Sequence, residues 1–226
     1  YILEGAYREF PKGTIHLLCV DSELTPENKH IVIKYQDSFF VGPDNGVFSL
    51  IFKDIIPEEI FEINLHSSFN YKVSSDNLFV KVIGHILRLG PLNVVGTKIN
   101  KIKEITNLRP IVNKEQNQII GSVIYIDNYG NVITNITEKL FKEISKTRSF
   151  TINARNVKFT KIYNNYSEAI DFSINRKDRE EDGKKMAIFN SLGYLQLSIY
   201  KSNPQTVGSA STLFGLNYRD PVSIYF

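Results

Sequence analysis

Hydrophobic and polar positions follow different patterns in the two halves of this 226-residue chain. In the first half, apolar runs of strand length predict strands at 14–20, 30–35, 38–41 and 59–65. The run at 14–20 is almost continuously apolar, which is typical of a strand buried on both faces. Gln36 and Asp37 separate two of the runs and predict a hairpin turn, and residues 1–9 are predicted to be helical.

A longer helix is predicted over residues 76–89 by apolar positions three to four residues apart, at Leu78, Val82, Ile86 and Leu89. Ser74 or Ser75 can cap its start, and the Gly90-Pro91 pair ends it. His85 lies inside this helix without a chemical partner nearby in sequence, so we interpret it as a structural histidine. Helices mixed with strands predict an α/β domain over residues 1–110.

The second half reads as short alternating strands, predicted at 119–126, 131–136, 149–153, 156–162, 185–189, 194–200 and 221–226. A short helix over 137–145, capped by Thr137, interrupts them, and the charged run 176–185 is interpreted as a solvated loop. This pattern predicts an all-β, barrel-like domain over residues 111–226, which follows a polar tract at 107–118.

Composition narrows the class of protein without defining its chemistry. The net charge is +3, and no Lys/Arg cluster is interleaved with aromatic residues, so nucleic acid is not the favoured partner. No apolar stretch has the length of a membrane helix and no signal peptide is visible; we expect a cytoplasmic protein. The single cysteine, Cys19, is predicted to be a small core residue. The opening segment "YILEGAYREFPKGT" reads as the middle of a helix, so we expect the natural protein to have a preceding portion.

The chemistry-bearing residues gather in turns. The histidines and the cysteine lack metal-ligand spacing, and neither a phosphate-binding glycine loop nor a nucleophilic-serine motif occurs. Asp21 directly follows an apolar run, where α/β sheets place ligand sites, although it could equally accept N–H groups of its own loop. The stretch "DNYGN" (127–131) forms a tight turn but carries more polar groups than a turn needs. "FNSLGYL" (189–195) and "GSASTLFGL" (208–216) are similar polar turns.

The order of these motifs is characteristic of a known family. "FPKGTIHLLCVDSE", "GPDNGVFSL", "DNLFVKV", "HILRLG", "DNYGNVITNI", "NSLGYL" and "GSASTLFGL" run in sequence along essentially the whole chain. The chain thereby resembles the S-adenosylmethionine (SAM) hydrolases, also called SAM hydroxide adenosyltransferases, which are relatives of the fluorinases and chlorinases.

The resemblance implies a fold, an assembly and a reaction. It implies an N-terminal α/β domain, a C-terminal β-barrel and a homotrimer in which SAM lies between domains of neighbouring subunits. It also implies attack of water on the ribose C5′ of SAM, releasing adenosine and methionine without a metal or a cofactor, since SAM is the substrate. A first strand and a ribose-binding aspartate would lie upstream of Tyr1.

The resemblance also assigns roles to individual residues. Asp127 matches an aspartate that binds the methionine amino group. Asn131 matches an asparagine that binds the adenine edge, and Tyr129 occupies an aromatic position beside it that would stack on adenine. Ser191 matches a serine at the methionine carboxylate. Ser209 and Ala210 match a small pair whose backbone contacts adenine.

The water-handling part of the site departs from the family pattern. Asp21 matches the aspartate of an Asp-Arg-His set, but Asn28 stands where the arginine is expected, with Lys29 next to it as a substitute. The family's histidine is expected just before Asp76, but the stretch "YKVSSD" (71–76) contains none; Ser74 falls near a halide-contacting position of the fluorinases. Two alternatives to SAM hydrolysis therefore stay open, namely a SAM- or adenosine-binding protein without turnover and a halide-using transferase.

Overall fold

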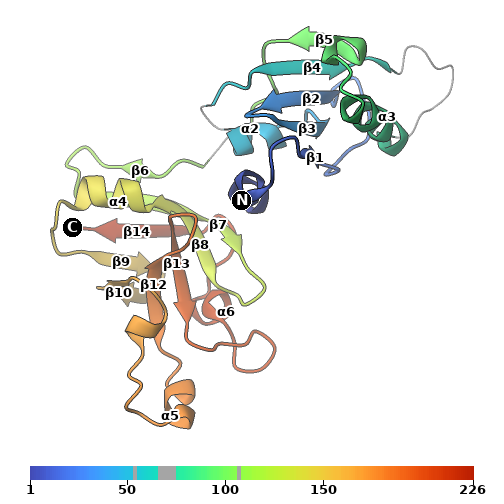
Figure 1. The fold of residues 1–226 in the computed structure, drawn as a ribbon. Coiled ribbons are helices and arrows are strands. Elements are labelled where there is room, and N and C mark those ends of the chain that lie inside the picture. Colours follow the sequence, from blue (N-terminus) through green and yellow to red (C-terminus); the bar gives the residue numbers. More distant parts are fainter. Residues whose placement is uncertain (53–54, 66–74, 106–107) are drawn as a thin grey trace. The chain divides into compact units, whose positions relative to one another are not determined.

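The computed structural model describes residues 1–52, 55–65, 75–105 and 108–226 (Figure 1). Contacts within the chain divide it into two compact units, Tyr1–Asn107 and Leu108–Phe226, which we call the N-terminal and the C-terminal unit. Each has a hydrophobic core of its own. The two units are described separately below.

The N-terminal unit is built on a mixed five-stranded sheet in the order β1-β3-β2-β4-β5, in which only the pairing of β1 with β3 is parallel. Its elements in chain order are α1 (Ile2–Ala6), the 3-10 turn η1 (Tyr7–Glu9), β1 (Ile15–Leu17), β2 (His30–Tyr35), β3 (Ser38–Pro43), α2 (Val47–Phe52), β4 (Glu59–Ile63), α3 (Ser75–Leu87), the 3-10 turn η3 (Leu92–Val94) and β5 (Gly96–Ile99).

Helices cover both faces of this sheet because alternate residues of its central strands are apolar on both sides. Val32 of β2 packs in one cluster with Phe79 of α3, whereas Ile31 and Ile33 pack in another with Phe48 of α2. Successive side chains of a strand point to opposite faces, so β2 is buried on both. The predicted α/β architecture of the first domain is confirmed.

Two local predictions in this unit are confirmed as well. The β2–β3 hairpin turns through Gln36 and Asp37, whose φ angles of 48° and 62° are those a tight two-residue hairpin turn requires. The helix predicted over 76–89 is α3. His85 Nε2 donates to the carbonyl of Pro91 at 2.9 Å, which ties the end of the helix to the chain beyond it and matches a structural role.

The prediction of a doubly buried strand over 14–20 is wrong. β1 has three residues and lies at one end of the strand order, so Leu17 is 44% exposed and Val20 66% exposed. Cys19, predicted to lie in the core, is also exposed. The physical reason is that a strand with one neighbour in the described sheet, followed at once by a loop, leaves one side of its apolar run open.

The C-terminal unit is a nine-stranded sheet in the order β10-β9-β14-β7-β8-β13-β12-β11, with β6 also paired to β7. Its elements in chain order are β6 (Ile111–Val112), β7 (Gln118–Ile126), β8 (Val132–Thr137), α4 (Glu138–Ser145), β9 (Thr151–Ala154), β10 (Val157–Phe159), β11 (Ile162–Tyr163), the 3-10 turn η4 (Ser167–Ala169), α5 (Arg176–Glu181), β12 (Lys185–Phe189), β13 (Tyr194–Ile199), α6 (Ala210–Phe214) and β14 (Pro221–Tyr225).

This sheet nearly closes on itself. The strands at the two ends of the order, β10 and β11, follow one another directly in the chain. One core cluster fills the enclosed side, with Ile119, Val132, Leu195 and Val222 among its fully buried members. The predicted barrel-like domain is therefore confirmed. The predicted cap of α4 is present too, since Leu140 N–H donates to Thr137 Oγ1 at 3.2 Å.

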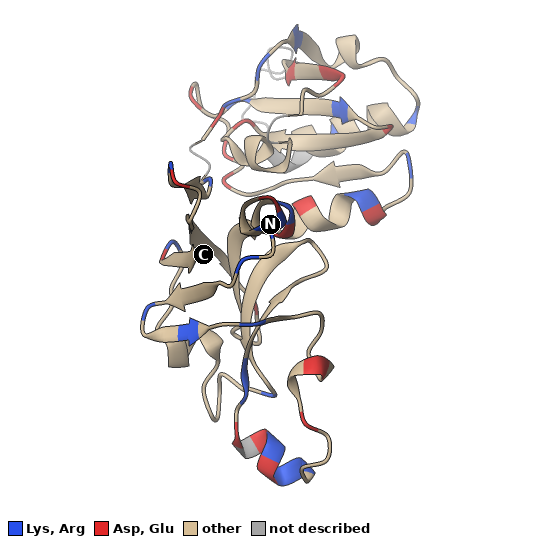
Figure 2. Cartoon of the chain, turned by 90° about the vertical axis from the view of Figure 1, so that its left-hand side faces the viewer, with Lys and Arg blue, Asp and Glu red and all other residues tan. Residues whose placement is uncertain are grey.

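The charged run at 176–185 is not a loop throughout, because residues Arg176–Glu181 form α5. Asn175 caps its first turn, and Arg176 pairs with Glu180 one turn later at 2.8 Å. Hydrogen bonds from Lys201 and then Arg176 lower the pKa of Glu180 to about 2. Lys and Arg alternate with Asp and Glu along this segment (Figure 2). α5 thus has no apolar face, and its N-cap and its surface ion pair support it.

Candidate functional site

The 127–131 turn joins β7 to β8 and is organised by the side chain of Asp127. Its Oδ1 accepts the N–H groups of Tyr129 and Asn131, both at 2.9 Å. The N–H of Gly130 donates to the Asp127 carbonyl at 2.9 Å, and that of Asp127 to the Asn131 carbonyl at 3.1 Å. Gly130 has a φ of 73°, a conformation that favours glycine. The backbone of this turn is thus fully explained by one carboxylate oxygen and one glycine.

A second group of contacts goes beyond what the turn requires. Asn131 is only 9% exposed, and its Nδ2 donates to Asp127 Oδ2 at 2.8 Å. The carboxylate therefore fixes the orientation of the Asn131 amide. Tyr129, by contrast, is 71% exposed, so its ring covers no part of the core.

Thr134 and Asn135, two polar residues that follow the turn, form hydrogen bonds within the C-terminal unit. Thr134 Oγ1 donates to the Leu195 carbonyl of β13 at 3.1 Å. Asn135 Oδ1 accepts the Ser122 N–H of β7 at 2.8 Å, and its Nδ2 donates to the Leu108 carbonyl. Both residues belong to β8 and have partners on neighbouring segments.

The start of α6 lies directly against the 127–131 turn. Ser211 N–H donates to the Gly130 carbonyl at 2.9 Å. A Cβ placed on Gly130 would lie 2.1 Å from Ser209 Oγ, so the turn and the helix start are in contact. Ser209 is the N-cap of α6 in a capping box with Thr212, and both Ser209 and Ala210 are fully buried. The structure thus brings together Asp127, Tyr129, Asn131, Ser209 and Ala210.

Ser191 lies in a second turn, 190–194, which joins β12 to β13. Its organisation repeats that of the first, since Asn190 Oδ1 accepts the N–H groups of Leu192 at 3.0 Å and Tyr194 at 3.1 Å. Gly193 has a φ of 74°. Ser191 itself is exposed.

The two turns lie at opposite ends of β8. In the antiparallel pairing of β8 with β13, Thr137 faces Tyr194 and Val132 faces Leu197. Five residue steps along β8 correspond to about 16 Å. Within the C-terminal unit, Ser191 is therefore not brought next to Asp127 and Asn131.

The loop after β1 holds the two residues expected to act on water. Asp21 is exposed and has a φ of 49°. Asn28, which stands at the family's arginine position, donates through Nδ2 to the carbonyls of Asp21 at 2.7 Å and Glu23 at 3.0 Å. Asn28 therefore holds this loop together. Lys29 Nζ binds Glu62 Oε2 at 2.9 Å, so Lys29 is engaged with a carboxylate other than Asp21.

Two acidic residues beside Lys29 were not singled out from the sequence. Glu62 lies in β4, opposite Ile31 of β2, and Asp44 follows β3. Burial raises the pKa of the Asp44 carboxyl above its ordinary value, although the N–H of Lys103, which donates to Asp44 Oδ1 at 2.8 Å, acts in the opposite direction. A half-buried carboxyl with a raised pKa at the end of a sheet is a signal for a functional site.

Three further observations complete the description of the candidate residues. Ser74 lies outside the described residues. Within the described ranges, no group of three or more His, Cys, Asp or Glu side chains is arranged to hold a metal ion. No helix of the described chain is both long and apolar enough to cross a membrane.

Comparison with known proteins shows which family has this fold and these motifs. The SAM hydroxide adenosyltransferase N-terminal domain matches residues 1–96, and the corresponding C-terminal domain matches residues 121–223. The chain belongs to the SAM hydroxide adenosyltransferase family.

Three individual proteins are similar to the chain in sequence or in fold. The chain is 27% identical over 233 residues to the (R)-S-adenosyl-L-methionine hydrolase of Methanocaldococcus jannaschii, a match that covers 100% of this chain and 76% of the relative. A crystal structure of an uncharacterized conserved protein from Thermotoga maritima matches with a TM-score of 0.77 and 25% identity, covering 100% of this chain and 82% of the other. A conserved hypothetical protein from Thermus thermophilus has the same fold, with a TM-score of 0.66 and 18% identity over 98% of this chain and 78% of its own.

Proposed function

We propose that this protein hydrolyses SAM to adenosine and L-methionine by attack of water on the ribose C5′. The C5′–S bond breaks and its electron pair stays on sulfur, so methionine leaves as a neutral thioether. The water oxygen bonds to C5′ and gives up one proton. The leaving group needs no acid, which leaves the protein to align the water and accept that proton. The observation that carries this proposal is the match of both halves of the chain to the two domains of the family.

The C-terminal unit would supply most of the binding groups. Asp127 would bind the methionine ammonium, Asn131 the adenine edge and Tyr129 the adenine face, while the backbone of Ser209 and Ala210 would contact adenine. The exposed Tyr129 ring and the contact between the turn and α6 support this grouping. Ser74 near the reacting centre would complete the proposed set. Ser191 lies at the other end of β8, too far from Asp127 to bind the carboxylate of the same methionine.

The N-terminal unit would handle the water. Asp21 would accept its proton, since it matches the family's water-handling aspartate and is exposed in the loop after β1. Lys29 would act through the pair that it forms with Glu62 rather than by contacting Asp21. We further propose a cytoplasmic homotrimer with SAM bound between subunits, which size-exclusion chromatography with light scattering tests through the molar mass.

The function is tested with the full-length protein, SAM and water enriched in oxygen-18. The (R) and (S) sulfonium epimers are supplied separately because the Methanocaldococcus relative is named for the (R) epimer. We expect methionine and adenosine carrying one oxygen-18 atom at the 5′ position, detected by mass spectrometry, with the yield unchanged by EDTA. Unreacted SAM under saturating conditions, or a nucleoside other than adenosine, would contradict the proposal.

Asp21→Asn tests which unit handles the water. Loss of a general base is expected to lower kcat about 100-fold or more, with a much smaller change in KM. Glu23→Gln is the matched control, because Glu23 is an exposed acid of the same loop. Equal kcat values for the two variants would remove Asp21 from the mechanism.

One observation favours a second function, which is SAM or adenosine binding without turnover. The Asn28 side chain donates to loop carbonyls and brings no positive charge to the position of the family's arginine. Tight SAM binding by calorimetry with no product after prolonged incubation would favour this second function. A rate that depends on chloride would instead indicate a halide nucleophile.

A further inference from the structure

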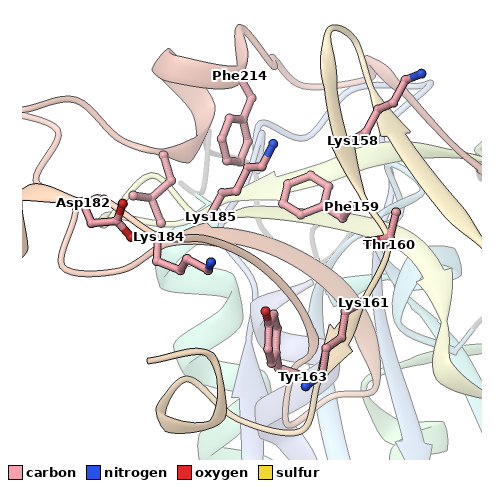
Figure 3. Close-up of a pocket in the computed structure, with 11 residues that line it drawn as sticks. Lys158, Phe159, Thr160, Lys161, Tyr163, Asp182, Lys184, Lys185 and Phe214 are labelled. Atoms are coloured by element: carbon pink, nitrogen blue, oxygen red, sulfur yellow. The ribbon is translucent and has the colours of Figure 1, made fainter. Parts of the chain in front are cut away.

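The C-terminal unit contains a cavity of about 460 Å³ that shares no lining residue with the 127–131 turn. It is lined by β10, β11, the start of β12 and the end of α6 (Figure 3). β10 and β11 are the two ends of the strand order, so the cavity lies where the barrel-like sheet fails to close. The mouths of β-barrels are common ligand sites, and this volume suits a molecule of nucleotide size.

The charge of the cavity lining is strongly positive. Four lysines line it, Lys158, Lys161, Lys184 and Lys185, against a single aspartate, Asp182. Lys161 pairs with Glu168 at 3.1 Å. Among the described residues, no carboxylate lies within ion-pair distance of the other three lysines. Ammonium groups gathered around one cavity repel one another, and a bound anion would relieve that repulsion.

The remaining walls are aromatic and apolar. Phe159 of β10 and Phe214 of α6 meet edge to face with ring centroids 5.7 Å apart. Lys185 Nζ lies 5.7 Å from the centre of the Phe159 ring, and Lys161 Nζ lies 4.5 Å from that of Tyr163. Figure 3 shows the Phe159, Tyr163 and Phe214 rings among the lysine side chains. Phe159 and Phe214 are only 5% and 7% exposed, whereas Tyr163 is half-buried, so the cavity offers cationic groups and the ring of Tyr163.

From these features we propose that the cavity binds a nucleotide, with its phosphates at Lys184 and Lys185 and its base against the Tyr163 ring. Ammonium groups are point-charge ligands for phosphate, and every nucleobase has a face that stacks on an aromatic ring. The cations line one open pocket rather than a stripe along the surface, which favours a single nucleotide over a nucleic-acid strand.

Binding is tested by isothermal titration calorimetry on the full-length protein in EDTA, with GTP, tripolyphosphate and guanosine as the three probes. GTP is chosen because its base does not present the adenine edge expected at Asn131. We expect GTP to bind most tightly and guanosine most weakly, with GTP affinity falling as salt rises because charges are paired.

Two double variants locate the site. Lys184→Gln/Lys185→Gln is expected to weaken GTP binding about tenfold or more. Lys114→Gln/Lys139→Gln removes the same charge from exposed positions elsewhere in the C-terminal unit and is expected to leave the affinity unchanged. Lys184→Arg/Lys185→Arg should retain binding, and circular dichroism verifies that each variant is folded.

Three results would overturn the proposal. They are no measurable GTP binding at low salt, equal loss of affinity in the two glutamine variants, and tripolyphosphate binding as tightly as GTP. The last would show that the Tyr163 ring contributes nothing. Because GTP binding is measured without SAM, these outcomes are independent of whether the protein hydrolyses SAM.

Discussion

The 127–131 and 190–194 turns of the C-terminal unit have one hydrogen-bond pattern and two different surroundings. In each, an Asp or Asn side chain accepts the N–H groups two and four residues later, and a glycine with φ near 74° stands between them. Gly130 is in contact with Ser209, whereas a Cβ on Gly193 would meet no atom within 4 Å. The first turn also orients a nearly buried amide, Asn131.

The comparison separates what a turn requires from what a binding site requires. Both turns form with one acceptor oxygen and one glycine, so neither feature is a sign of function. The features confined to the first turn are the second carboxylate oxygen bound to Asn131, the exposed Tyr129 and the close approach of α6. These are the features that the proposed SAM site uses.

The largest expected difference between the turns comes from their glycines. Gly193→Ala should destabilise the protein by about 1 kcal/mol, the cost of a left-handed conformation for alanine. Gly130→Ala has the same conformational cost, and its Cβ would also lie 2.1 Å from Ser209 Oγ. We therefore expect it to destabilise the protein by about 3 kcal/mol or more. Urea unfolding followed by circular dichroism measures both.

The glycine pair also carries a binding readout. Gly130→Ala should abolish SAM binding at concentrations where Gly193→Ala binds normally, because it displaces α6 from the turn. Equal destabilisation by the two alanines would show that the contact with Ser209 is loose, and the distinction between the turns would fail.

A smaller effect is expected from exchanging the two acceptor side chains. Asp127→Asn keeps an oxygen for the turn, as Asn190 does in the other turn, but sets its Nδ2 against Asn131 Nδ2. We therefore expect a loss of stability of about 1–2 kcal/mol, from the broken hydrogen bond between the two side chains. It removes the charge proposed to hold the ammonium of SAM, so the affinity should fall about 10- to 100-fold. Asn190→Asp is the matched control and should leave the affinity unchanged. The affinity is measured by calorimetric titration with SAM. Equal affinities of the wild type and the Asp127→Asn variant would show that Asp127 does not bind SAM.

The smallest effect is expected at the central residues of the turns, Tyr129 and Leu192. Tyr129 is 71% exposed, so Tyr129→Ala should alter stability by less than about 0.5 kcal/mol. If its ring stacks on adenine, the SAM affinity should drop by about 1 kcal/mol, or several-fold. In the same titration, Leu192→Ala should leave the SAM affinity unchanged. Tyr129→Phe, which keeps the ring, should bind SAM with nearly the wild-type affinity. A Tyr129→Ala variant with full affinity would leave the ring without a role.

Elements defined by local pattern could be predicted from the sequence. α3 has a repeating apolar face, and the β2–β3 hairpin has two residues suited to left-handed conformations. The exposure of Cys19 could not be predicted from the sequence, because it depends on the place of β1 in the sheet order. α5 was missed because its turns are joined by charge pairs, a signal that apolar periodicity does not contain.

The same distinction applies to the candidate site. The 127–131 turn stood out because its polar residues exceed what a turn uses, and that excess is visible in five consecutive letters. The Lys29–Glu62 pair and the half-buried Asp44 come from three separate strand ends, which only the pairing of β2, β3 and β4 brings to one edge. The burial that raises the pKa of Asp44 is a property of the folded sheet.

The hydrogen bond from Asn131 Nδ2 to Asp127 Oδ2 bears on how this protein would tell one purine from another. With one N–H of its nitrogen held by the carboxylate, the Asn131 amide is fixed in orientation, and its carbonyl oxygen can only accept. An exocyclic amine satisfies that oxygen, whereas the oxo group of hypoxanthine would place two acceptors face to face, a mismatch of about 1–3 kcal/mol. Deaminated SAM would then bind more weakly than SAM because the Asp127–Asn131 hydrogen bond fixes the amide. No additional residue would be needed for this discrimination.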